Sequence, residues 1–549
     1  MGSSSQKSSR RFLAIFAAMV VLILAGATIS AHAQTYSVLY IVPGSPGVQN
    51  PIGLIAQGRN GDMYAVSNSG GTFYGTAFKF TPAGTVTVIN DVGYFPWGGL
   101  TLGTDGQFYG QDSDGGVVGN CGLAAGGQVY KLTSAGVMTV LHNFTGGTDG
   151  CAPQAAPIEG INGIFYGTTP NLNNGTVYSV TSSGTFTTLH TFTGTDGQGV
   201  YAPLLQGADG NFYGDTVYGG TSGNGVVYKM TAAGVVTVLH NFAGAPDGAN
   251  PYFGLTQTSD GNFYGVTTDG GTFYGTVFKM TPSGVVTVLH TFTNGPSDGA
   301  SPSSPLTLAS DGKLYGVTSG GGTTGGGTIY RITTGGTYSV LYNFNNKNSA
   351  TGFNPASPLR QNTNGMFYGT AYYGGEYSTC NCGVVYSFDM RLAAFANLQT
   401  TSGKEGARIG ILGQGFTDSS IVKFGGAQAT TVTRSGSTYL AATVPVAALT
   451  GTVTVTTGAT TLATPQTFRV TPTLTSFTPP SGSVGTSVSI VGTAFTQGTK
   501  VAFNGKSASF TVDSDEQITA TVPTGATTGK ITVTTKGGAA TSATKFTVN

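Results

Sequence analysis

The chain has 549 residues, with 23 basic and 22 acidic side chains and a formal net charge of +1. Charged residues make up only 8% of the sequence, and no basic run follows residue 33, which excludes nucleic-acid or acidic-membrane binding through clustered Lys and Arg. Glycine is abundant, at 89 residues, and Thr, Val, Tyr and Phe accompany it, which predicts many short strands joined by tight turns.

The first 33 residues have the pattern of a cleaved signal peptide. Lys7, Arg10 and Arg11 form a positive start, residues 12–27 are apolar or small, and residues 31–33 read Ala-His-Ala, a small-x-small cleavage pattern. The alternative is an uncleaved anchor, but the apolar run is shorter than the ~20 residues that span a bilayer. We therefore expect cleavage after this segment, and a secreted or cell-surface protein without a membrane span.

Two short sequence patterns, each with a fixed place for an aromatic residue and here called aromatic markers, recur along the next 360 or so residues. Their spacing of about 50 residues is typical of repeat architectures. The first marker, a tyrosine after an Asp-Gly or Asn-Gly turn, occurs at Tyr64, Tyr109, Tyr166, Tyr213, Tyr264, Tyr315 and Tyr368. The second, in a Gly-x-Val-Tyr-Lys-like strand, occurs at Phe78, Tyr130, Tyr178, Tyr228, Phe278, Tyr330 and Tyr386. Both markers therefore indicate seven repeats.

Each repeat contains four strand-like segments. In the fifth repeat these segments are residues 253–257, 262–268, 275–281 and 285–292, and Asp260-Gly261 forms a hairpin signal between the first two. Four antiparallel strands in a repeat of this length are typical of a β-propeller blade. The sequence therefore predicts a seven-bladed β-propeller over residues 34–392.

A duplicated hexapeptide predicts how the ring closes. Residues 35–40 and residues 337–342 both read TYSVLY, and the second copy is the fourth strand of the sixth repeat. The seventh repeat ends after its third strand, residues 383–389, and lacks a fourth strand of its own. We therefore predict that residues 36–42 form the outer strand of the last blade, which would leave no exposed sheet edge.

Through the FYG and VYK-type strands that carry these markers, residues 34–397 resemble the GloVer tandem-repeat family. That resemblance implies a secreted bacterial protein with varied means of surface attachment. The family has no assigned activity, so the resemblance implies location and fold more than function.

The last 157 residues or so form a duplicated module, with predicted bounds 393–471 and 472–549. Ser402-Gly403 and Phe416 of the first copy recur as Ser481-Gly482 and Phe495 of the second, and both copies contain alternating strands that predict immunoglobulin-like β-sandwiches. Through Pro480-Ser481-Gly482 the second copy resembles the IPT/TIG domain, and the first copy resembles it more loosely. This resemblance implies extracellular spacers or adhesion units. The predicted fold class is thus all-β: a seven-bladed β-propeller followed by two immunoglobulin-like β-sandwiches.

Three sets of polar residues are candidate metal ligands. The first set is His142, His190, His240 and His290; equivalent outer-strand positions of a ring lie far apart, and the sixth repeat has Tyr342 there, so we expect these histidines to pack or to form hydrogen bonds. The second set, Asp105, Asp209, Asp260 and Asp311, precedes glycine and fits turns. The third set is Asp149, Asp196, Asp247 and Asp298, and its spacing matches no known calcium-binding loop. We therefore predict no metal and no cofactor.

Four cysteines are an even number in a chain that we expect to enter an oxidising space. Cys121 and Cys151 lie in long loops on the same predicted face of the second blade, so we predict a disulfide between them. Cys380 and Cys382 would then pair with each other in a tight ring or remain free thiols.

Aromatic residues in glycine-rich loops on that face are the candidate ligand-binding residues. Such rings can stack on sugars or can cap their own blades, and the sequence leaves both interpretations open. The candidates are Phe73, Tyr74, Tyr218, Phe273, Tyr274, Tyr372, Tyr373 and Tyr377.

No catalytic residue is predicted, because the sequence has no Gly-x-Ser-x-Gly, no His-Glu-x-x-His and no recognisable carboxylate pair. We therefore favour a non-catalytic binding or scaffold protein that contacts an extracellular polysaccharide or a cell-surface protein. The alternative is an extracellular carbohydrate-active enzyme, a lyase or hydrolase. Convergent Asp, Glu, Arg or His side chains at one mouth of the central channel would favour the enzyme, and an aromatic, uncharged mouth would favour binding.

Overall fold

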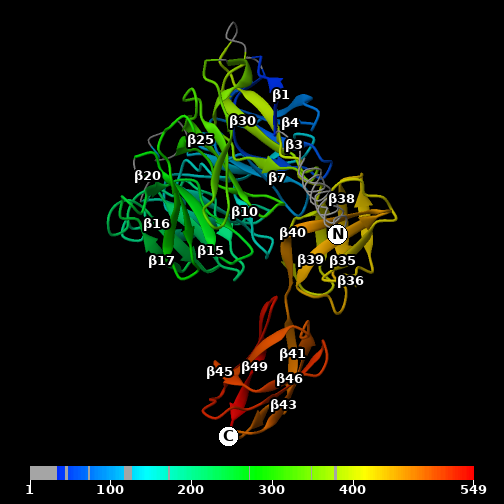
Figure 1. Ribbon diagram of the computed structural model, residues 1–549. Helices are drawn as coiled ribbons and strands as arrows, with labels where there is room; N and C mark the ends of the chain where they lie inside the picture. The colour runs from blue at the N-terminus through cyan, green and yellow to red at the C-terminus, as the bar shows by residue number, and fades with distance from the viewer. Residues whose placement is uncertain are drawn as a thin grey trace, which may run out of the picture.

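The computed structural model describes residues 34–43, 47–71, 75–116, 121, 126–170, 174–270, 273–347, 349–375 and 380–549 (Figure 1). Within these ranges the chain is all-β, and its helical content is the single 3-10 turn η1 (Ser349–Thr351). No helix in this described part is long and apolar enough to cross a bilayer.

Residues 35–389, here called the repeat region, form seven antiparallel sheets in the described part of the chain. The first sheet contains β2 (Val48–Gln57), β3 (Met63–Gly70), β4 (Thr76–Phe80) and β5 (Val86–Asp91). The second contains β6 (Leu100–Leu102), β7 (Phe108–Asp112), β8 (Gln128–Leu132) and β9 (Met138–Asn143). The third contains β10 (Ile158–Glu159), β11 (Phe165–Thr169), β12 (Thr176–Val180) and β13 (Phe186–Thr191). The fourth contains β14 (Leu205–Gln206), β15 (Phe212–Thr216), β16 (Val226–Met230) and β17 (Val236–Asn241).

The remaining three sheets have a divided inner strand. The fifth contains β18 (Ala249–Pro251), β19 (Thr256–Gln257), β20 (Phe263–Asp269), β21 (Thr276–Met280) and β22 (Val286–Thr291). The sixth contains β23 (Gly299–Pro302), β24 (Thr307–Leu308), β25 (Leu314–Gly321), β26 (Thr328–Ile332) and β27 (Tyr338–Asn343). The seventh contains β28 (Phe353–Pro355), β29 (Arg360–Gln361), β30 (Phe367–Tyr373), β31 (Val384–Asp389) and, as its outer strand, β1 (Thr35–Ile41).

The seventh sheet combines the two ends of the repeat region. β1 pairs antiparallel with β31, from Thr35 opposite Asp389 to Ile41 opposite Val384. The β1 ring of Tyr36 stacks on Tyr342 of the sixth sheet, with centroids 4.0 Å apart and planes 8° apart. This is the pairing that the duplicated TYSVLY segment predicts.

The two aromatic markers of the sequence form the buried core of the repeat region. All seven second-strand tyrosines and all seven third-strand aromatics are buried. Second-strand rings also stack on the next sheet: Tyr109 lies 3.6 Å from Phe165, and Tyr64 lies 4.0 Å from Phe108, centroid to centroid. Each such pair contributes about 0.5–1.5 kcal/mol beyond the burial of its apolar area, so the markers join neighbouring sheets.

The hairpin turns are held by the residue that precedes glycine. The Tyr109 hydroxyl donates to Asp105 Oδ2 at 2.8 Å, and Asn162 Nδ2 donates to the Tyr166 hydroxyl at 2.8 Å. Gly106, after Asp105, has φ +87°, a conformation that glycine adopts without steric cost. Asp and Asn therefore serve the same turn, which confirms the structural interpretation of the first aspartate set.

Residues 397–470 form the first C-terminal module, whose two sheets share one hydrophobic core. One sheet contains β32 (Asn397–Leu398), β34 (Arg408–Leu412), β38 (Tyr439–Thr443) and β37 (Val432–Ser435). The other contains β33 (Ser402–Gly403), β40 (Thr460–Val470), β39 (Gly451–Thr457), β35 (Ile421–Phe424) and β36 (Ala427–Gln428).

Residues 473–548 form the second C-terminal module, with the same strand order and a core of its own. Its sheets contain β41 (Thr473–Thr478), β43 (Ser487–Thr493), β47 (Gln517–Thr521) and β46 (Phe510–Val512), and β42 (Ser481–Gly482), β49 (Gly538–Val548), β48 (Gly529–Thr535), β44 (Gly498–Phe503) and β45 (Lys506–Ala508). Figure 1 shows this module extending away from the repeat region, while the first module lies beside it.

The first C-terminal module packs directly on the repeat region. The guanidinium of Arg59 lies over the Tyr439 ring, 4.3 Å from its centroid, and the Thr438 hydroxyl donates to the Arg59 carbonyl at 2.6 Å. Leu102 of β6 packs against Leu412 and Tyr439. The junction thus combines apolar, aromatic and polar contacts.

Candidate functional site

One cavity of about 280 Å³ is lined by all seven sheets or the segments that lead into them, so it lies on the axis around which the sheets are arranged. Its lining is Ile52, Gly53, Leu54, Trp97, Gly98, Gln154, Ala155, Tyr201, Ala202, Pro203, Tyr252, Phe253, Ser303, Ser304, Pro305, Ala356 and Pro358. We call it the axial pocket. No carboxylate, imidazole, amine or guanidinium occurs among these lining residues, so the pocket is uncharged.

One side of the axial pocket is aromatic. Tyr201 and Tyr252 stack with centroids 4.7 Å apart and planes 16° apart, and Phe253 lies 5.1 Å from Tyr252. Trp97, the single tryptophan of the chain, lines the same cavity and stacks on Phe95 at 6.1 Å. Tyr201, Tyr252, Trp97 and Phe253 are all half-buried, so their rings keep a surface toward the cavity.

A buried carboxyl group forms a hydrogen bond with the loop that carries Tyr252 and Phe253. Gly254 N donates to Asp215 Oδ2 at 3.0 Å. Burial raises the pKa of Asp215 to about 7, although the hydrogen bond from Gly254 lowers it. Asp215 does not line the cavity, so its role is to position the loop.

Polar contacts within the axial pocket are few. The Tyr252 hydroxyl lies 3.5 Å from Gln154 Oε1, and burial raises the pKa of Tyr252 to about 12, so this phenol remains a hydrogen-bond donor at neutral pH. The other polar groups of the lining are those of Gln154, Ser303 and Ser304, the Tyr201 hydroxyl and the Trp97 indole N–H. A neutral ligand with hydroxyl groups and an apolar face matches this combination.

Among the predicted ligand-binding residues that the structure describes, Tyr218 lies close to two residues of the axial pocket. Tyr218 is 49% exposed. Burial is the main cause that raises the pKa of Tyr201 and of Tyr252, and the nearby phenol of Tyr218 raises both further. Tyr218 therefore lies near the stacked pair, although it does not line the pocket.

The other described candidates do not converge on the axial pocket. Phe273 is 86% exposed, while Tyr274 is half-buried and packs against the core between the fifth and sixth sheets. Asn68 Nδ2 donates to the Tyr372 hydroxyl at 3.3 Å, and Tyr373 stacks on Phe353 at 5.5 Å. Phe73, Tyr74 and Tyr377 lie outside the described residues. Ligand binding by this set stays a prediction.

Sequence reasoning missed Trp97, Tyr201, Tyr252 and Phe253 because they share no motif. Each lies in the segment before an inner strand, where the repeats differ most. Their position in the repeat is a signal that could have found them. The segments before the inner strands contain Pro203, Pro305 and Pro358 at similar distances before the marker tyrosines, which marks these segments as equivalent.

The histidine and aspartate sets form four pairs along the outer strands. His142 bonds Asp149 at 3.1 Å, and the equivalent pairs His190–Asp196, His240–Asp247 and His290–Asp298 have distances of 2.8, 3.0 and 3.0 Å. Each aspartate belongs to the loop that leads to the next sheet. The hydrogen-bonding interpretation of the histidines is thus confirmed. Among the described residues no group of three or more His, Cys, Asp or Glu is arranged to hold a metal ion.

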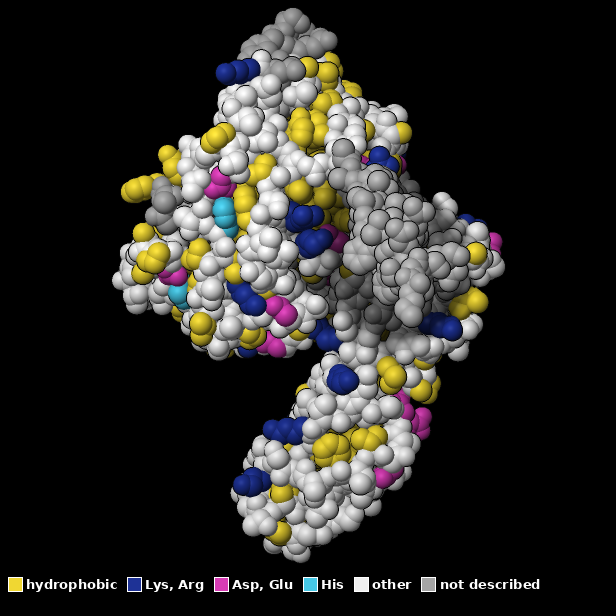
Figure 2. Space-filling view, viewed as in Figure 1, with side chains coloured by type: hydrophobic (Ala, Val, Ile, Leu, Met, Phe, Trp, Pro, Cys, Tyr) yellow, Lys and Arg dark blue, Asp and Glu magenta, His cyan; other side chains and the backbone are white. Residues whose placement is uncertain are grey.

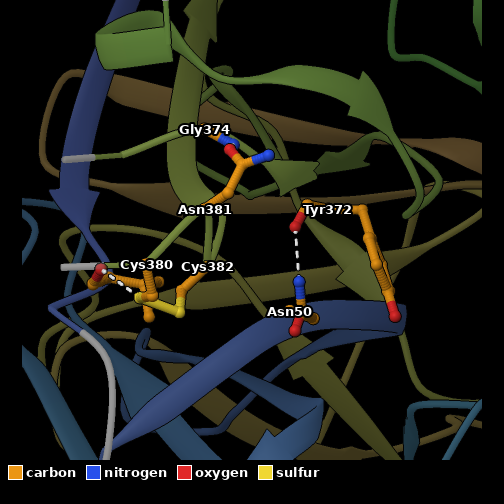
Figure 3. Close-up of a disulfide and its surroundings, with 7 residues drawn as sticks. Asn50, Tyr372, Gly374, Cys380, Asn381 and Cys382 are labelled. Carbon is orange, nitrogen blue, oxygen red and sulfur yellow. Dashed lines mark hydrogen bonds between the residues drawn. A yellow bond between two sulfur atoms is a disulfide. The ribbon is translucent and has the colours of Figure 1, made fainter. Parts of the chain in front are cut away.

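The disulfide in the structure joins Cys380 and Cys382 (Figure 3). Beside it, Asn381 Oδ1 accepts a hydrogen bond from Gly374 N at 2.7 Å, and Asn50 Nδ2 donates to the Tyr372 carbonyl at 2.9 Å. The bond therefore closes a short loop between β30 and β31, next to the first sheet.

The disulfide predicted between Cys121 and Cys151 is not formed in the structure, where both are free thiols. The two side chains are neighbours, since a hydrogen bond between them lowers the pKa of Cys121, which burial raises overall. Oxidation would therefore need little movement. The bond stays a prediction that non-reducing peptide mapping of the purified protein tests.

Charged side chains are few and lie singly or in small groups over the described part of the face seen in Figure 2, most of which is neutral. This agrees with the low charge content of the sequence. No basic patch of the kind that binds nucleic acid is seen on this face.

The sequence model of the Gloeobacter/Verrucomicrobia repeat matches residues 116–308 and 273–412, and the model of the IPT/TIG domain matches residues 396–470 and 472–548. The GloVer and IPT/TIG resemblances are thereby confirmed. No curated protein matches this chain.

Solved structures resemble the chain only remotely. A fungal alcohol oxidase of the AA5 family in complex with copper is 13% identical, with a TM-score of 0.44 over 94% of this chain and 100% of that one. The WD40 β-propeller domain of Doa1 is 11% identical, with a TM-score of 0.42 over 65% and 98%. A luciferin-regenerating enzyme is 13% identical, with a TM-score of 0.36 over 66% and 98%. These similarities say nothing about the activity of this chain.

Proposed function

Since this chain belongs to the Gloeobacter/Verrucomicrobia repeat family, we propose that it is a non-catalytic, extracellular binding and scaffold protein. Its ligand site is the axial pocket, and the ligand class is a neutral glycan. Repeats of this family and IPT/TIG domains are typical of extracellular proteins, which supports the location.

The observation that carries this proposal is the aromatic, uncharged lining of the axial pocket. Tyr201, Tyr252, Phe253 and Trp97 offer ring faces, and Gln154 with two serines offers hydrogen bonds. Sugars present an apolar face and a rim of hydroxyl groups, so ring stacking with a few polar contacts suits them. The volume, about 280 Å³, is near the lower end of ligand pockets and suits the end of a glycan chain.

The alternative, a polysaccharide lyase or hydrolase, is not what this lining favours. Glycoside hydrolysis commonly needs two carboxyl groups beside the scissile bond, and proton abstraction needs a base of suitable pKa. The lining residues of the axial pocket supply neither group.

The proposal includes a specific architecture. Residues 1–33 are a signal peptide, residues 34–392 are a closed seven-bladed β-propeller, and residues 393–471 and 472–549 are immunoglobulin-like sandwiches that act as spacers. The pairing of β1 with β31 and the lining of one cavity by seven sheets support the ring. Its partner is an extracellular polysaccharide or the glycan of a cell-surface protein.

A glycan array probed with the purified chain from residue 34 onward tests the function. We expect binding to a limited group of neutral glycans, with a weaker signal when Tyr252 is replaced by Leu. Absence of binding to any glycan, or release of shortened products from a bound polysaccharide, would contradict the proposal.

A further inference from the structure

Arg360 stands out within a ring of equivalent positions on the seven inner strands. Each position is opposite the marker tyrosine of its own sheet, so the seven side chains have the same orientation relative to the channel. They are Ala56, Thr101, Ile158, Leu205, Thr256, Thr307 and Arg360. Six are uncharged, and the seventh is an arginine.

Two cavities, of about 230 and 320 Å³, are both lined by Arg360. They lie at the junction with the first C-terminal module, because Asn397 and Gln466 of that module line both of them. The first cavity also shares Leu54 and Phe253 with the axial pocket, so the two cavities are neighbours along the channel.

The guanidinium of Arg360 is not satisfied by the protein. Its Nε atom is buried without a hydrogen-bond partner, although the residue as a whole is half-buried, and no ion pair of Arg360 occurs within the described ranges. Gln466 Oε1 is likewise buried and unpaired, while Gln466 Nε2 donates to Asn397 Oδ1 at 2.6 Å. Rotation of the Gln466 amide would place an N–H group where the unpaired oxygen is.

Arg360 is a half-buried cation with no counter-charge from the protein, and its Nε atom is shielded from water. Burial lowers the pKa of Arg360, and no carboxylate nearby offsets that shift. Arginine nonetheless stays charged in proteins, so an anion that enters the cavity is strongly favoured. The planar guanidinium matches a carboxylate in particular, through two parallel hydrogen bonds.

We propose that Arg360 anchors the carboxylate of an acidic sugar at the junction of the repeat region and the first C-terminal module. Asn397 and Gln466 supply further polar contacts from the module side. This site shares Phe253 with the axial pocket but not Tyr201, Tyr252 or Trp97, and it does not depend on glycan binding in the axial pocket. The carboxylate belongs either to a free uronic acid or to a uronate unit of a polysaccharide.

Isothermal titration of the chain from residue 34 onward with D-galacturonate, oligogalacturonate, galactose and inorganic phosphate tests the site. We expect a carboxylate-bearing sugar to bind and galactose to bind less well. Arg360→Gln should weaken this binding about 10-fold to 100-fold, the loss typical of a hydrogen-bonded charge. Arg391→Gln is the matched control, because Arg391 is 59% exposed and pairs with Asp389 outside the cavities.

The different ligands of the titration distinguish a free sugar acid from a polysaccharide as the source of the carboxylate. Binding of galacturonate itself assigns a free sugar acid, and binding of the oligomer alone assigns a polysaccharide. Equal affinity of wild type and Arg360→Gln, no binding of either carboxylate, or tighter binding of phosphate than of both would overturn the proposal.

Stability gives a second, independent readout. Replacing an uncompensated buried charge is often neutral or stabilising, so Arg360→Gln should fold with an unchanged or higher Tm. Galacturonate should raise the Tm of wild type and leave that of Arg360→Gln unchanged. Arg360→Lys, which keeps the charge but loses the planar fork, should bind with intermediate affinity. Tyr252→Leu should retain the galacturonate response, which distinguishes failure of this site from failure of the axial pocket.

Discussion

Gln57 on β2 and Thr363 in the turn after β29 are joined by two hydrogen bonds, although 306 residues separate them. Thr363 N donates to Gln57 Oε1 at 3.0 Å, and Gln57 Nε2 donates to the Thr363 hydroxyl at 2.7 Å. The same type of contact joins internal sheets, for example from Ile161 N to Gln206 Oε1 at 2.9 Å. The first and seventh sheets therefore meet in the same way as consecutive sheets do.

Gln57→Leu should lower the free energy of unfolding of the repeat region by about 1–3 kcal/mol, because Thr363 N is buried and would lose its acceptor. Leucine fits sterically, since Leu102 and Leu308 occupy the equivalent positions of two other sheets. Gln206→Leu is the control. Ile161 N is exposed and can donate a hydrogen bond to water instead, so this variant should lose less free energy of unfolding. Chemical denaturation measures both, and equal stability of Gln57→Leu and wild type would exclude this closing contact as a stabilising one.

A second prediction concerns the glycine after the marker tyrosine. A Cβ atom on Gly110 would lie 2.7 Å from the Tyr130 hydroxyl oxygen, so Gly110→Ala should cost about 1–3 kcal/mol through overpacking. The first sheet has Ala65 opposite Phe78 at this register, where no hydroxyl is present. Adding Tyr130→Phe to Gly110→Ala should recover only part of the loss, because Tyr130 Cζ and Leu100 Cδ2 would still lie 2.8 and 2.9 Å from the added Cβ atom.

Tyr130→Phe alone is the matched control for that pair. The Tyr130 hydroxyl is buried without a hydrogen-bond partner, so its removal should be neutral or slightly stabilising. Thermal unfolding of the three variants measures the coupling. Additive effects would mean that the hydroxyl is not what excludes a side chain at residue 110.

Acid stability should depend on the histidine–aspartate pairs. Burial alone would raise the pKa of Asp298, but hydrogen bonds from His290 and Thr293 lower it to about 2. Because this pKa is below the ordinary value of 3.8, the ionised group stabilises the fold above pH 3.8, and that contribution is lost as pH falls toward 2. Asp298→Asn should reduce the loss of stability over that interval.

The exposed residue Asp269 provides the comparison, because Asp269→Asn also removes one carboxylate but at a site open to solvent. Unfolding midpoints between pH 5 and pH 2 measure the effect. If Asp298→Asn and wild type lose stability in parallel, the pair does not contribute to the acid transition.

The architecture of the repeat region was predictable because the sequence patterns that specify it occur two or more times in the chain. The marker tyrosines predicted buried strands, since a large aromatic residue at a fixed place in seven repeats needs seven equivalent core positions. The TYSVLY duplication predicted the partner of β1, because equal segments form equal strands. Both inferences use residues that repeat.

The axial pocket was not predictable from the same signals. Its lining comes from seven segments about 50 residues apart, and Trp97, Tyr201 and Tyr252 have no counterpart of the same type in most repeats. Only the three-dimensional closure brings them together. The free Cys121 and Cys151 thiols show a similar limit, because a shared loop face predicts proximity but not the oxidation state of the sulfur atoms.

The last prediction separates the axial pocket from the aromatic loops as the ligand site. Tyr252→Leu removes one ring of the stacked pair, and it should weaken binding of an array-identified neutral glycan about 2-fold to 10-fold, the worth of one stacking contact. The double variant Tyr372→Ala/Tyr373→Ala should leave that affinity unchanged, because Tyr373 stacks on Phe353 and neither tyrosine lines the pocket. Titration calorimetry on folded, monodisperse protein measures both. The reverse result, loss in the double variant with Tyr252→Leu unaffected, would place the ligand on the loops and remove the axial pocket from the proposal.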